Sequence, residues 1–375
     1  MPRTHSDLEV SWEHTRAFRM TRMHLIEPLG PRSLRKVARD LGGVQAQVHS
    51  AAELQFAARL DGLAAGAVER AIYKSKTLVK TWMMRGTIHY LDSSDLPVWA
   101  AASETRQTWH KPYWQKAFGL TSKNVQDALD AIDSVIGAEP LTREELADEV
   151  HRKTRNKALD ELMRQGWGSI LKIAAAQGLL CFGPSRGRNV TFVRPSEWLK
   201  GFAQPPAEDA IVEVCRRYLA SHGPATREEF ARWWGFKAPD ARKVLESMDD
   251  EITLVDRAGD NAYLLARDLD AVASAIEDSE VRALGMFDAY TLAGLPHEQI
   301  VAKAHKAKVY RTGAWVSQVI MQGGRVAGTW SHERKPKGTI VDVELFPGRK
   351  ISRRAVERAL QRLQPFLGKI SKLTI

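Results

Sequence analysis

The sequence has little of what marks a secreted or membrane protein. Only two cysteines, Cys181 and Cys215, occur among 375 residues, which excludes a disulfide framework and favours a reducing compartment. The first residues, MPRTHSDLEVSWEH, contain no apolar stretch, so no signal peptide is expected. The longest apolar run, Ile170–Phe182, is interrupted by Lys172 and Gln177 and is too short to span a bilayer. We therefore expect a soluble cytoplasmic protein without a membrane partner.

Many enzyme motifs are also missing. The sequence contains no P-loop, no Gly-x-Gly-x-x-Gly after a strand, no His-Glu-x-x-His, no Cys-x-x-Cys and no Gly-x-Ser-x-Gly. Its 11 histidines do not cluster at the spacing of metal ligands, so neither a metal nor another cofactor is expected. Any catalysis must therefore depend on scattered polar side chains.

The composition points to a globular protein with a polyanionic partner. A chain of 375 residues is long enough for two to four domains. The formal charge is +10 and the isoelectric point is near 9.5. An excess of positive charge of this size favours binding to nucleic acid, although it does not require it.

A short segment is repeated along the chain. Residues 140–147 (PLTREELA) and 224–231 (PATREEFA) are near copies, and residues 31–38 (PRSLRKVA) form a weaker third copy. Each copy offers Ser33, Thr142 or Thr226 as the N-cap of a helix. The latter two add a glutamate three residues later, Glu145 or Glu229, which completes a capping box.

The flanks of the three copies are also alike. An amphipathic helix is predicted before each copy, at residues 14–26, 124–136 and 209–221. After the copies come predicted helices at 66–73, 157–177 and 239–248, and then hairpins at 78–91, 179–193 and 252–265. Helix, short helix, helix and hairpin is the order of a winged helix-turn-helix. Chance recurrence of the capping boxes is the alternative, but three concordant flanks disfavour it.

We therefore predict a mainly helical α+β fold with three tandem winged helix-turn-helix units. An antiparallel β-rich module with strands at 308–310, 315–321, 325–331 and 339–346, and a closing helix at 352–366, follows them. The expected domains are residues 1–95, 96–200, 201–280 and 281–375. Residues 96–118, which include Trp99, Trp109, Tyr113 and Trp114, should form a linking helix whose aromatic residues pack against a neighbouring unit, with base stacking as the alternative.

The stretch Gly42–Ser50 carries the first candidate site. Ser50 and Glu53 form a capping-box pattern, so a helix is predicted to begin at Ser50. Gln45 and Gln47 would then lie in the extended lead-in, where side chains at i and i+2 point the same way. Two carboxamides directed at one point could form a site, or they could satisfy backbone groups of the turn.

Basic side chains gather at the predicted wings and turns. Such groups are often solvated surface, but their placement favours phosphate contacts, which set affinity and register without reading sequence. The candidate DNA-binding residues are Lys80, Arg85, His89, Arg155, Arg186, Arg188, Arg334, Lys335 and Lys337. For Arg85 and His89, which are expected near the glutamines, a role in the core is an equal alternative.

Three stretches resemble the AlkZ/YcaQ family of bacterial DNA glycosylases, which have a tandem winged-helix architecture. They are LGGVQAQVHSAAELQFAARL, TWMMRGTIHYL and FDAYTLAG followed by VYRTGAWVSQVIMQGGRVAGTW. Gln45, Ala46 and Gln47 match the family's Gln-Φ-Gln motif, where Φ is an apolar residue. The YcaQ branch has Gln-Φ-Asp there, so this chain is similar to the AlkZ branch.

The resemblance implies excision of alkylated purines, including bulky adducts and interstrand crosslinks, from double-stranded DNA. An N7-alkylated purine leaves as a neutral base, so catalysis reduces to placing a water beneath C1′ as the sugar becomes cationic. We expect Gln45 and Gln47 to hold that water and the hairpin around Lys335 to probe the minor groove. A monomeric, monofunctional enzyme that leaves an abasic site is expected. A winged-helix regulator and a DNA-bridging protein are the alternatives.

Overall fold

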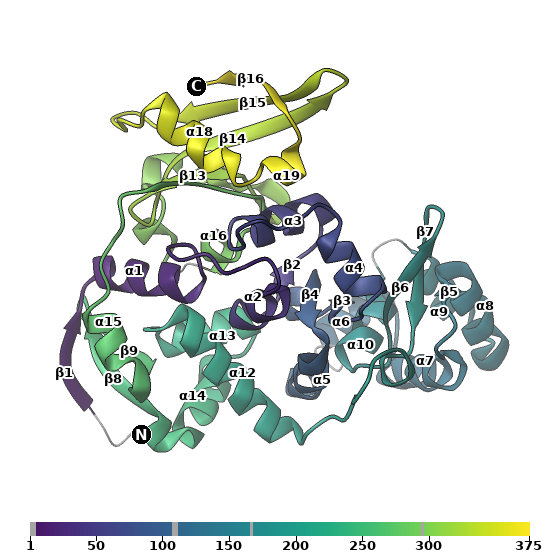
Figure 1. Ribbon diagram of the computed structural model, residues 1–375. Helices are drawn as coiled ribbons and strands as arrows, with labels where there is room; N and C mark the ends of the chain where they lie inside the picture. The colour runs from purple at the N-terminus through teal and green to yellow at the C-terminus, as the bar shows by residue number, and fades with distance from the viewer. Residues whose placement is uncertain (1–4, 107–111, 166–167, 294–295) are drawn as a thin grey trace. The chain divides into compact units, whose positions relative to one another are not determined.

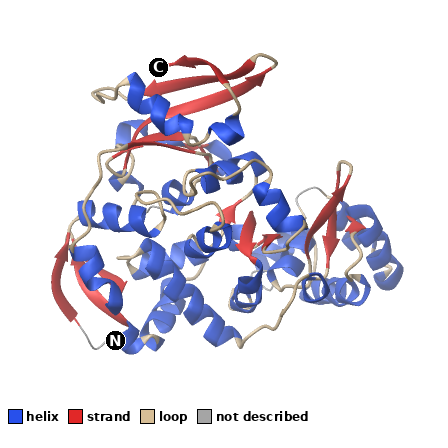
Figure 2. Cartoon of the chain, viewed as in Figure 1, coloured by secondary structure: helices blue, strands red, loops and turns tan. Residues whose placement is uncertain are grey.

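The computed structural model describes residues 5–106, 112–165, 168–293 and 296–375 (Figure 1). The chain forms two compact units, and the first of them is built from both ends of the chain. This unit comprises Met1–Val68 and Cys215–Ile375, whereas the second comprises Glu69–Val214. The expected α+β class is confirmed, and Figure 2 shows the helices and strands that make it up. Within the described residues, none of the helices combines the length and apolar character needed to cross a bilayer.

The N-terminal part of the first unit carries the glutamine segment. Its elements are β1 (His5–Val10), α1 (Trp12–Arg22), α2 (Leu34–Asp40), β2 (Val44–Gln45), α3 (His49–Ala57) and the start of α4 (Ala67–Tyr73). Helix α1 begins earlier than predicted because the Ser11 side chain accepts a hydrogen bond from the His14 N–H at 3.2 Å. Ser33 precedes α2 as expected, although its side chain makes no capping bond.

The third repeat copy forms another part of this unit. Its elements are the second half of α12 (Ala207–His222), from Cys215 onward, then α13 (Arg227–Trp234), α14 (Ala238–Ser247), β8 (Ile252–Arg257), β9 (Asp260–Leu265) and α15 (Leu269–Ala273). The predicted capping box of Thr226 and Glu229 is confirmed. Strand β1, which the sequence analysis did not predict, pairs in parallel with β8, and Val10 joins Val255 and Leu264 in one core cluster.

A buried ion pair braces the third copy. Arg257, the last residue of β8, donates two hydrogen bonds to the Glu229 carboxylate, at 2.8 and 3.0 Å. The Arg257 side chain is 0% exposed and that of Glu229 is 9% exposed. Because Glu229 also accepts from the Thr226 N–H at 3.0 Å, one carboxylate ties the helix start to the end of the hairpin strand.

The C-terminal part of the first unit is a five-stranded sheet with helices beside it. Its elements are β10 (Val281–Leu284), α16 (Ala289–Ala293), α17 (Lys306–Val309), β11 (Tyr310–Arg311), β12 (Trp315–Val316), β13 (Val319–Gln322), β14 (Arg325–Lys335), β15 (Gly338–Leu345), α18 (Arg353–Gln361), α19 (Gln364–Leu367) and β16 (Ile370–Thr374). The strand order in the sheet is β10-β13-β14-β15-β16. Gly323 and Gly324 make the tight turn between β13 and β14, and both have positive φ angles, 55° and 65°.

Four predictions for this module were wrong. The strand expected at 308–310 begins only at Tyr310, because Lys306–Val309 form α17. The strand expected at 315–321 is interrupted between β12 and β13. The strand expected to end at residue 331 runs on to Lys335, which pairs with Gly338 at the start of β15. The closing helix is two helices, α18 and α19, and is followed by β16, which pairs in parallel with β15.

The second unit contains the other two hairpins. Its elements are the rest of α4, then β3 (Leu78–Trp82), β4 (Ile88–Asp92), α5 (Leu96–Ser103), α6 (Pro112–Phe118), α7 (Ser122–Val135), β5 (Leu141–Thr142), α8 (Arg143–Thr154), α9 (Lys157–Arg164), α10 (Ser169–Ala176), β6 (Cys181–Arg186), β7 (Asn189–Val193) and α11 (Pro195–Trp198). The capping box of Thr142 and Glu145 is confirmed. The single helix predicted at 157–177 is wrong, because α9 and α10 are separate helices and Gly168, in a left-handed conformation, precedes α10.

The aromatic residues of the linking segment have different roles. Trp99 is buried in α5, and Trp114 packs partly buried against the unit's core cluster, so the packing prediction is confirmed for these two. Tyr113 is exposed, and Trp109 lies outside the described residues. The linking segment is at least two helices, α5 and α6.

Candidate active site

The glutamine segment enters α3 from a glycine turn. Gly42 and Gly43 have φ angles of 65° and 103°, a backbone conformation that residues with a side chain rarely adopt. Val44 and Gln45 then form β2, so an extended lead-in with Gln45 in it is confirmed. The predicted helix start was wrong: Val48 is the N-cap and α3 begins at His49. The extended backbone of Val48 ends the lead-in one residue earlier than the Ser50 capping pattern suggested.

The two glutamines of the motif have different surroundings. Gln45 is 7% exposed and Ala46 is 3% exposed, so both are buried. Gln47, which follows the end of β2, is exposed. The pair therefore combines one amide held within the protein and one that reaches solvent.

A buried amide from α3 contacts the motif directly. The Gln55 side chain donates from Nε2 to the carbonyl oxygen of Gln45 at 3.0 Å. Gln55 is fully buried. The backbone carbonyl oxygen of Gln55 accepts a hydrogen bond from Arg59 Nη1 at 2.9 Å.

Arg59 anchors the end of α3 to the C-terminal part of the same unit. Its guanidinium donates to both carboxylate oxygens of Asp288, at 2.7 and 2.8 Å, and from Nε to the Met23 carbonyl at 2.9 Å. Both charged side chains are 0% exposed. Removing one partner of such a pair would leave an uncompensated buried charge, which costs about 3–5 kcal/mol.

The hairpin formed by β3 and β4, which carries Lys80, Arg85 and His89, falls within Glu69–Val214 of the second unit. The expected proximity of Arg85 and His89 to the glutamines stays a prediction. Lys80 is half-buried on β3, and its Nζ lies 4.8 Å from the centre of the Phe182 ring. Burial lowers the pKa of Lys80. Arg85 is exposed at the turn, with φ 57°, and desolvation by surrounding protein lowers its pKa to about 10.

His89 is buried and neutral. Burial, followed by the charges of Arg85 and Arg106, lowers the pKa of His89 to about 3. Its Nδ1 lies 3.0 Å from the Thr87 carbonyl oxygen. A neutral imidazole in this position cannot supply a positive charge to a phosphate.

Two basic residues near this wing were missed by the sequence analysis. Arg106 donates to the Ser103 hydroxyl at 2.9 Å, and burial followed by the charge of Arg85 lowers its pKa to about 10. Lys172 extends past Gly86, where an added Cβ would lie 3.9 Å from the Lys172 Cδ. A lysine inside an otherwise apolar run was the available signal for Lys172, whereas nothing in the pattern marked Arg106.

The other predicted DNA-binding residues divide into two groups. Three of them bind other residues of the protein. Arg186 donates two hydrogen bonds of 2.9 Å to Glu145. Arg334 donates to the Phe366 carbonyl, and Lys335 pairs with Glu333. Within the described part of the chain, the side chains of Arg155, Arg188 and Lys337 are exposed and form no hydrogen bond or ion pair with the protein.

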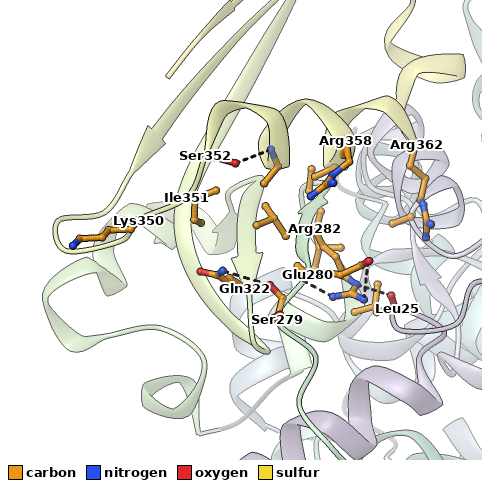
Figure 3. Close-up of a pocket in the computed structure, with 16 residues that line it drawn as sticks. Leu25, Ser279, Glu280, Arg282, Gln322, Lys350, Ile351, Ser352, Arg358 and Arg362 are labelled. Atoms are coloured by element: carbon orange, nitrogen blue, oxygen red, sulfur yellow. Dashed lines mark hydrogen bonds and ion pairs between the residues drawn. The ribbon is translucent and has the colours of Figure 1, made fainter.

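A separate cavity of about 500 Å³ lies between β10 and α18 in the first unit (Figure 3). Its charges are partly compensated, since Arg282 pairs with Asp278 and Arg362 lies 3.4 Å from Asp61. Lys350 points away from it (Figure 3). None of the predicted site residues, all of which lie in the described ranges, lines this cavity. Among the residues described, no group of three or more His, Cys, Asp or Glu side chains could hold a metal ion.

Comparison with known proteins identifies the chain's relatives. The model of the DNA glycosylase AlkZ-like family matches residues 38–366. An interstrand DNA cross-link repair glycosylase of Streptomyces sahachiroi is 36% identical over 347 residues, which cover 90% of each chain. The solved structure of the Streptomyces sahachiroi DNA glycosylase AlkZ is 34% identical and superposes with a TM-score of 0.89 over 98% of this chain and 99% of that one.

The shared fold and the matched family model define an enzyme, a DNA glycosylase. The chain belongs to the AlkZ-like DNA glycosylase family, so the resemblance carried by the Gln-Ala-Gln segment is confirmed.

Proposed function

We propose that this glycosylase hydrolyses the N-glycosidic bond of alkylated purines of the N7-alkylguanine type in double-stranded DNA and leaves an abasic site. Bulky adducts and interstrand crosslinks fall within this class. The name of the Streptomyces sahachiroi relative, a cross-link repair glycosylase, supports that extension. The observation that carries the proposal is the Gln-Ala-Gln segment of an AlkZ-like chain, placed at the entrance to α3.

Gln45 and Gln47 are proposed to hold the attacking water. Alkylation at N7 makes the purine a neutral leaving group, so a strong general acid is not required. A carboxamide oxygen can accept a hydrogen bond from water and face the positive charge that develops at C1′. The exposure of Gln47 supports direct access to DNA, and the burial of Gln45 supports a fixed geometry.

DNA binding is proposed to involve the three segments in which helices precede a hairpin, interpreted as winged helix-turn-helix units within the four predicted domains. Lys80, Arg85 and Arg106 would contact the backbone near the first wing, and Lys337 would do so at the tip of the β14–β15 hairpin, which would probe the minor groove. A monomer acting in the cytoplasm is sufficient for this chemistry.

The decisive experiment measures release of free base from duplex DNA carrying N7-methylguanine, a bulky N7-guanine adduct or a defined crosslink. Gln45→Ala and Gln47→Ala should each reduce single-turnover excision by roughly 100-fold, which corresponds to ~2.7 kcal/mol of transition-state stabilisation. Their affinity for DNA should change little.

Gln361→Ala provides the matched control, since Gln361 is exposed on α18 in the same unit. It should excise at the parent rate. Parent-rate excision by both motif variants would overturn the catalytic assignment. Failure of the parent enzyme to release any of the three lesions would overturn the proposed substrate class.

A further inference from the structure

The side-chain amide of Gln55 packs against the backbone of the glutamine motif. Gln55 is fully buried in α3, and its Nε2 donates to the Gln45 carbonyl at 3.0 Å. A carbonyl can only accept, so the chemistry of this contact fixes which end of the Gln55 amide faces Gln45. Within the described part of the chain, the opposite end, Oε1, has no hydrogen-bond partner.

Burying an amide whose oxygen has no hydrogen-bond partner lowers the stability of a packed interior. A methionine has a similar length and would fill the same volume without a buried polar atom. The feature that Gln55 adds over an apolar residue is therefore its single hydrogen bond to Gln45.

Contacts hold the rest of α3 in place, so the hydrogen bond from Gln55 can fix the orientation of the Gln45 carbonyl. Arg59 donates to the backbone carbonyl of Gln55 and forms the buried ion pair with Asp288. Gly285 packs directly on the helix, since a Cβ added there would lie 2.9 Å from the Leu54 Cβ. Gln55 thus projects from a helix fixed at two places.

We propose that Gln55 is a positioning residue for the glycosylase reaction, which orients the Gln45–Ala46 peptide through the Gln45 carbonyl. That peptide plane sets the directions in which the Gln45 and Gln47 side chains leave the backbone. The inference rests on the proposed role of these two glutamines. Gln55 does not touch the substrate, so its effect is on the geometry of the water site.

Gln55→Met tests the loss of the hydrogen bond at nearly constant volume. Single-turnover excision should fall by about 10- to 100-fold, because a misplacement of about 1 Å can reduce a rate by that factor. The dissociation constant for damaged DNA should change less than threefold. Leu60→Met, a buried change just beyond the same helix, is the control and should keep the parent excision rate.

Gln55→Glu adds the pH profile of excision as a second measurement, and this profile would not change if Gln55 had only a structural role. A protonated carboxyl group can donate to the Gln45 carbonyl, whereas the carboxylate would repel it. Excision by this variant should be high at low pH and fall as pH rises, with a titration that the parent lacks. The neighbouring charges, Arg59 and Asp288, are present in both proteins, and background depurination is subtracted with an enzyme-free control.

The outcomes separate the two proposals. Loss of excision in Gln45→Ala with parent-rate excision in Gln55→Met would overturn the positioning role alone. Parent-rate excision in both would overturn the catalytic role of Gln45 and the inference that rests on it. If Gln55→Met does not fold, a pH profile of Gln55→Glu identical in shape to that of the parent would still overturn the positioning role.

Discussion

The three hairpins that follow the repeat copies each carry an arginine, and its surroundings differ from one copy to the next. In the third copy, Arg257 is buried and paired with Glu229. In the second copy, Arg186 makes the same kind of fork to Glu145, but the two side chains are 51% and 44% exposed. In each case the partner is the glutamate of the capping box, so the pair joins a helix start to its hairpin.

The first copy departs from this pattern at one position. The residue three places after Ser33 is Lys36, so no capping-box glutamate is present there. Arg85, at the turn of the first hairpin, instead lies close enough to Arg106 for its charge to lower the pKa of that guanidinium. Two neighbouring cations attract an anion, whereas an arginine that is hydrogen-bonded to a glutamate stabilises the fold. The comparison therefore separates two hairpins that an arginine joins to a capping-box glutamate from one that has no such glutamate, and the proposed phosphate contact of the first hairpin is what the variants below test.

The largest effect is expected from breaking the buried fork. Arg257→Ala leaves the Glu229 carboxylate buried without its main partner, so the free energy of unfolding should fall by about 3–5 kcal/mol. Arg186→Ala, the equivalent change in the exposed pair, should cost about 0–1 kcal/mol. Urea unfolding of both variants measures the difference. Equal losses would show that burial does not distinguish the two copies.

The next largest effect concerns DNA affinity. Arg85→Gln and Arg106→Gln should each reduce the slope of log binding constant against log salt by about 0.9, the value for one lost phosphate contact. Affinity at physiological salt should fall by about tenfold. Arg358→Gln, at the cavity of Figure 3, is the control and should keep the parent slope. Parent slopes in both wing variants would contradict the phosphate assignment.

The pH dependence of stability should reveal the buried imidazole of this wing. The folded-state pKa of His89, about 3, lies below the usual value of 6.5, so only the unfolded chain takes up the proton between these values. The resulting stability is complete above pH 6.5 and is lost as pH falls. Between pH 7 and pH 5.5 the parent should lose about 1 kcal/mol through this group. Chemical denaturation of the parent and of His89→Gln at both pH values measures this difference. The variant should not lose the stability that His89 contributes, and a pH dependence equal to that of the parent would contradict the prediction.

The smallest effect compares two arginines of one hairpin. Arg188 is exposed beside the turn, whereas Arg186 is held by Glu145. Arg188→Ala should lower the salt slope by at most about 0.9, and Arg186→Ala should change it less. Fluorescence anisotropy across a salt series measures both. The reverse order would mean that the Glu145 fork opens to bind DNA.

Local patterns predicted the parts of the fold that depend on local interactions. The capping boxes of Thr142 and Thr226 gave correct helix starts because all their bonds lie within four residues. Strands β1 and β16 were missed because parallel pairing stabilises them. The partner of β1 is β8, which is distant in sequence, and β16 pairs with β15 across the intervening helices α18 and α19.

The candidate site was only partly accessible from the sequence. Gln45 and Gln47 were found through a local motif, and its family assignment was confirmed. Their different exposures, and the contact from Gln55, depend on how α3 packs. Arg59 and Asp288 are 229 residues apart, and no spacing rule connects two charges at that separation.

The same separation has a consequence during synthesis on the ribosome. Arg59 leaves the exit tunnel long before its counterion exists, and at about 5–20 residues per second the wait for Asp288 is roughly 10–45 seconds. Until then the helix behind the glutamine motif carries an uncompensated charge that resists burial. We expect nascent chains and products truncated before residue 288 to be inactive, so that base excision begins only once translation is nearly complete.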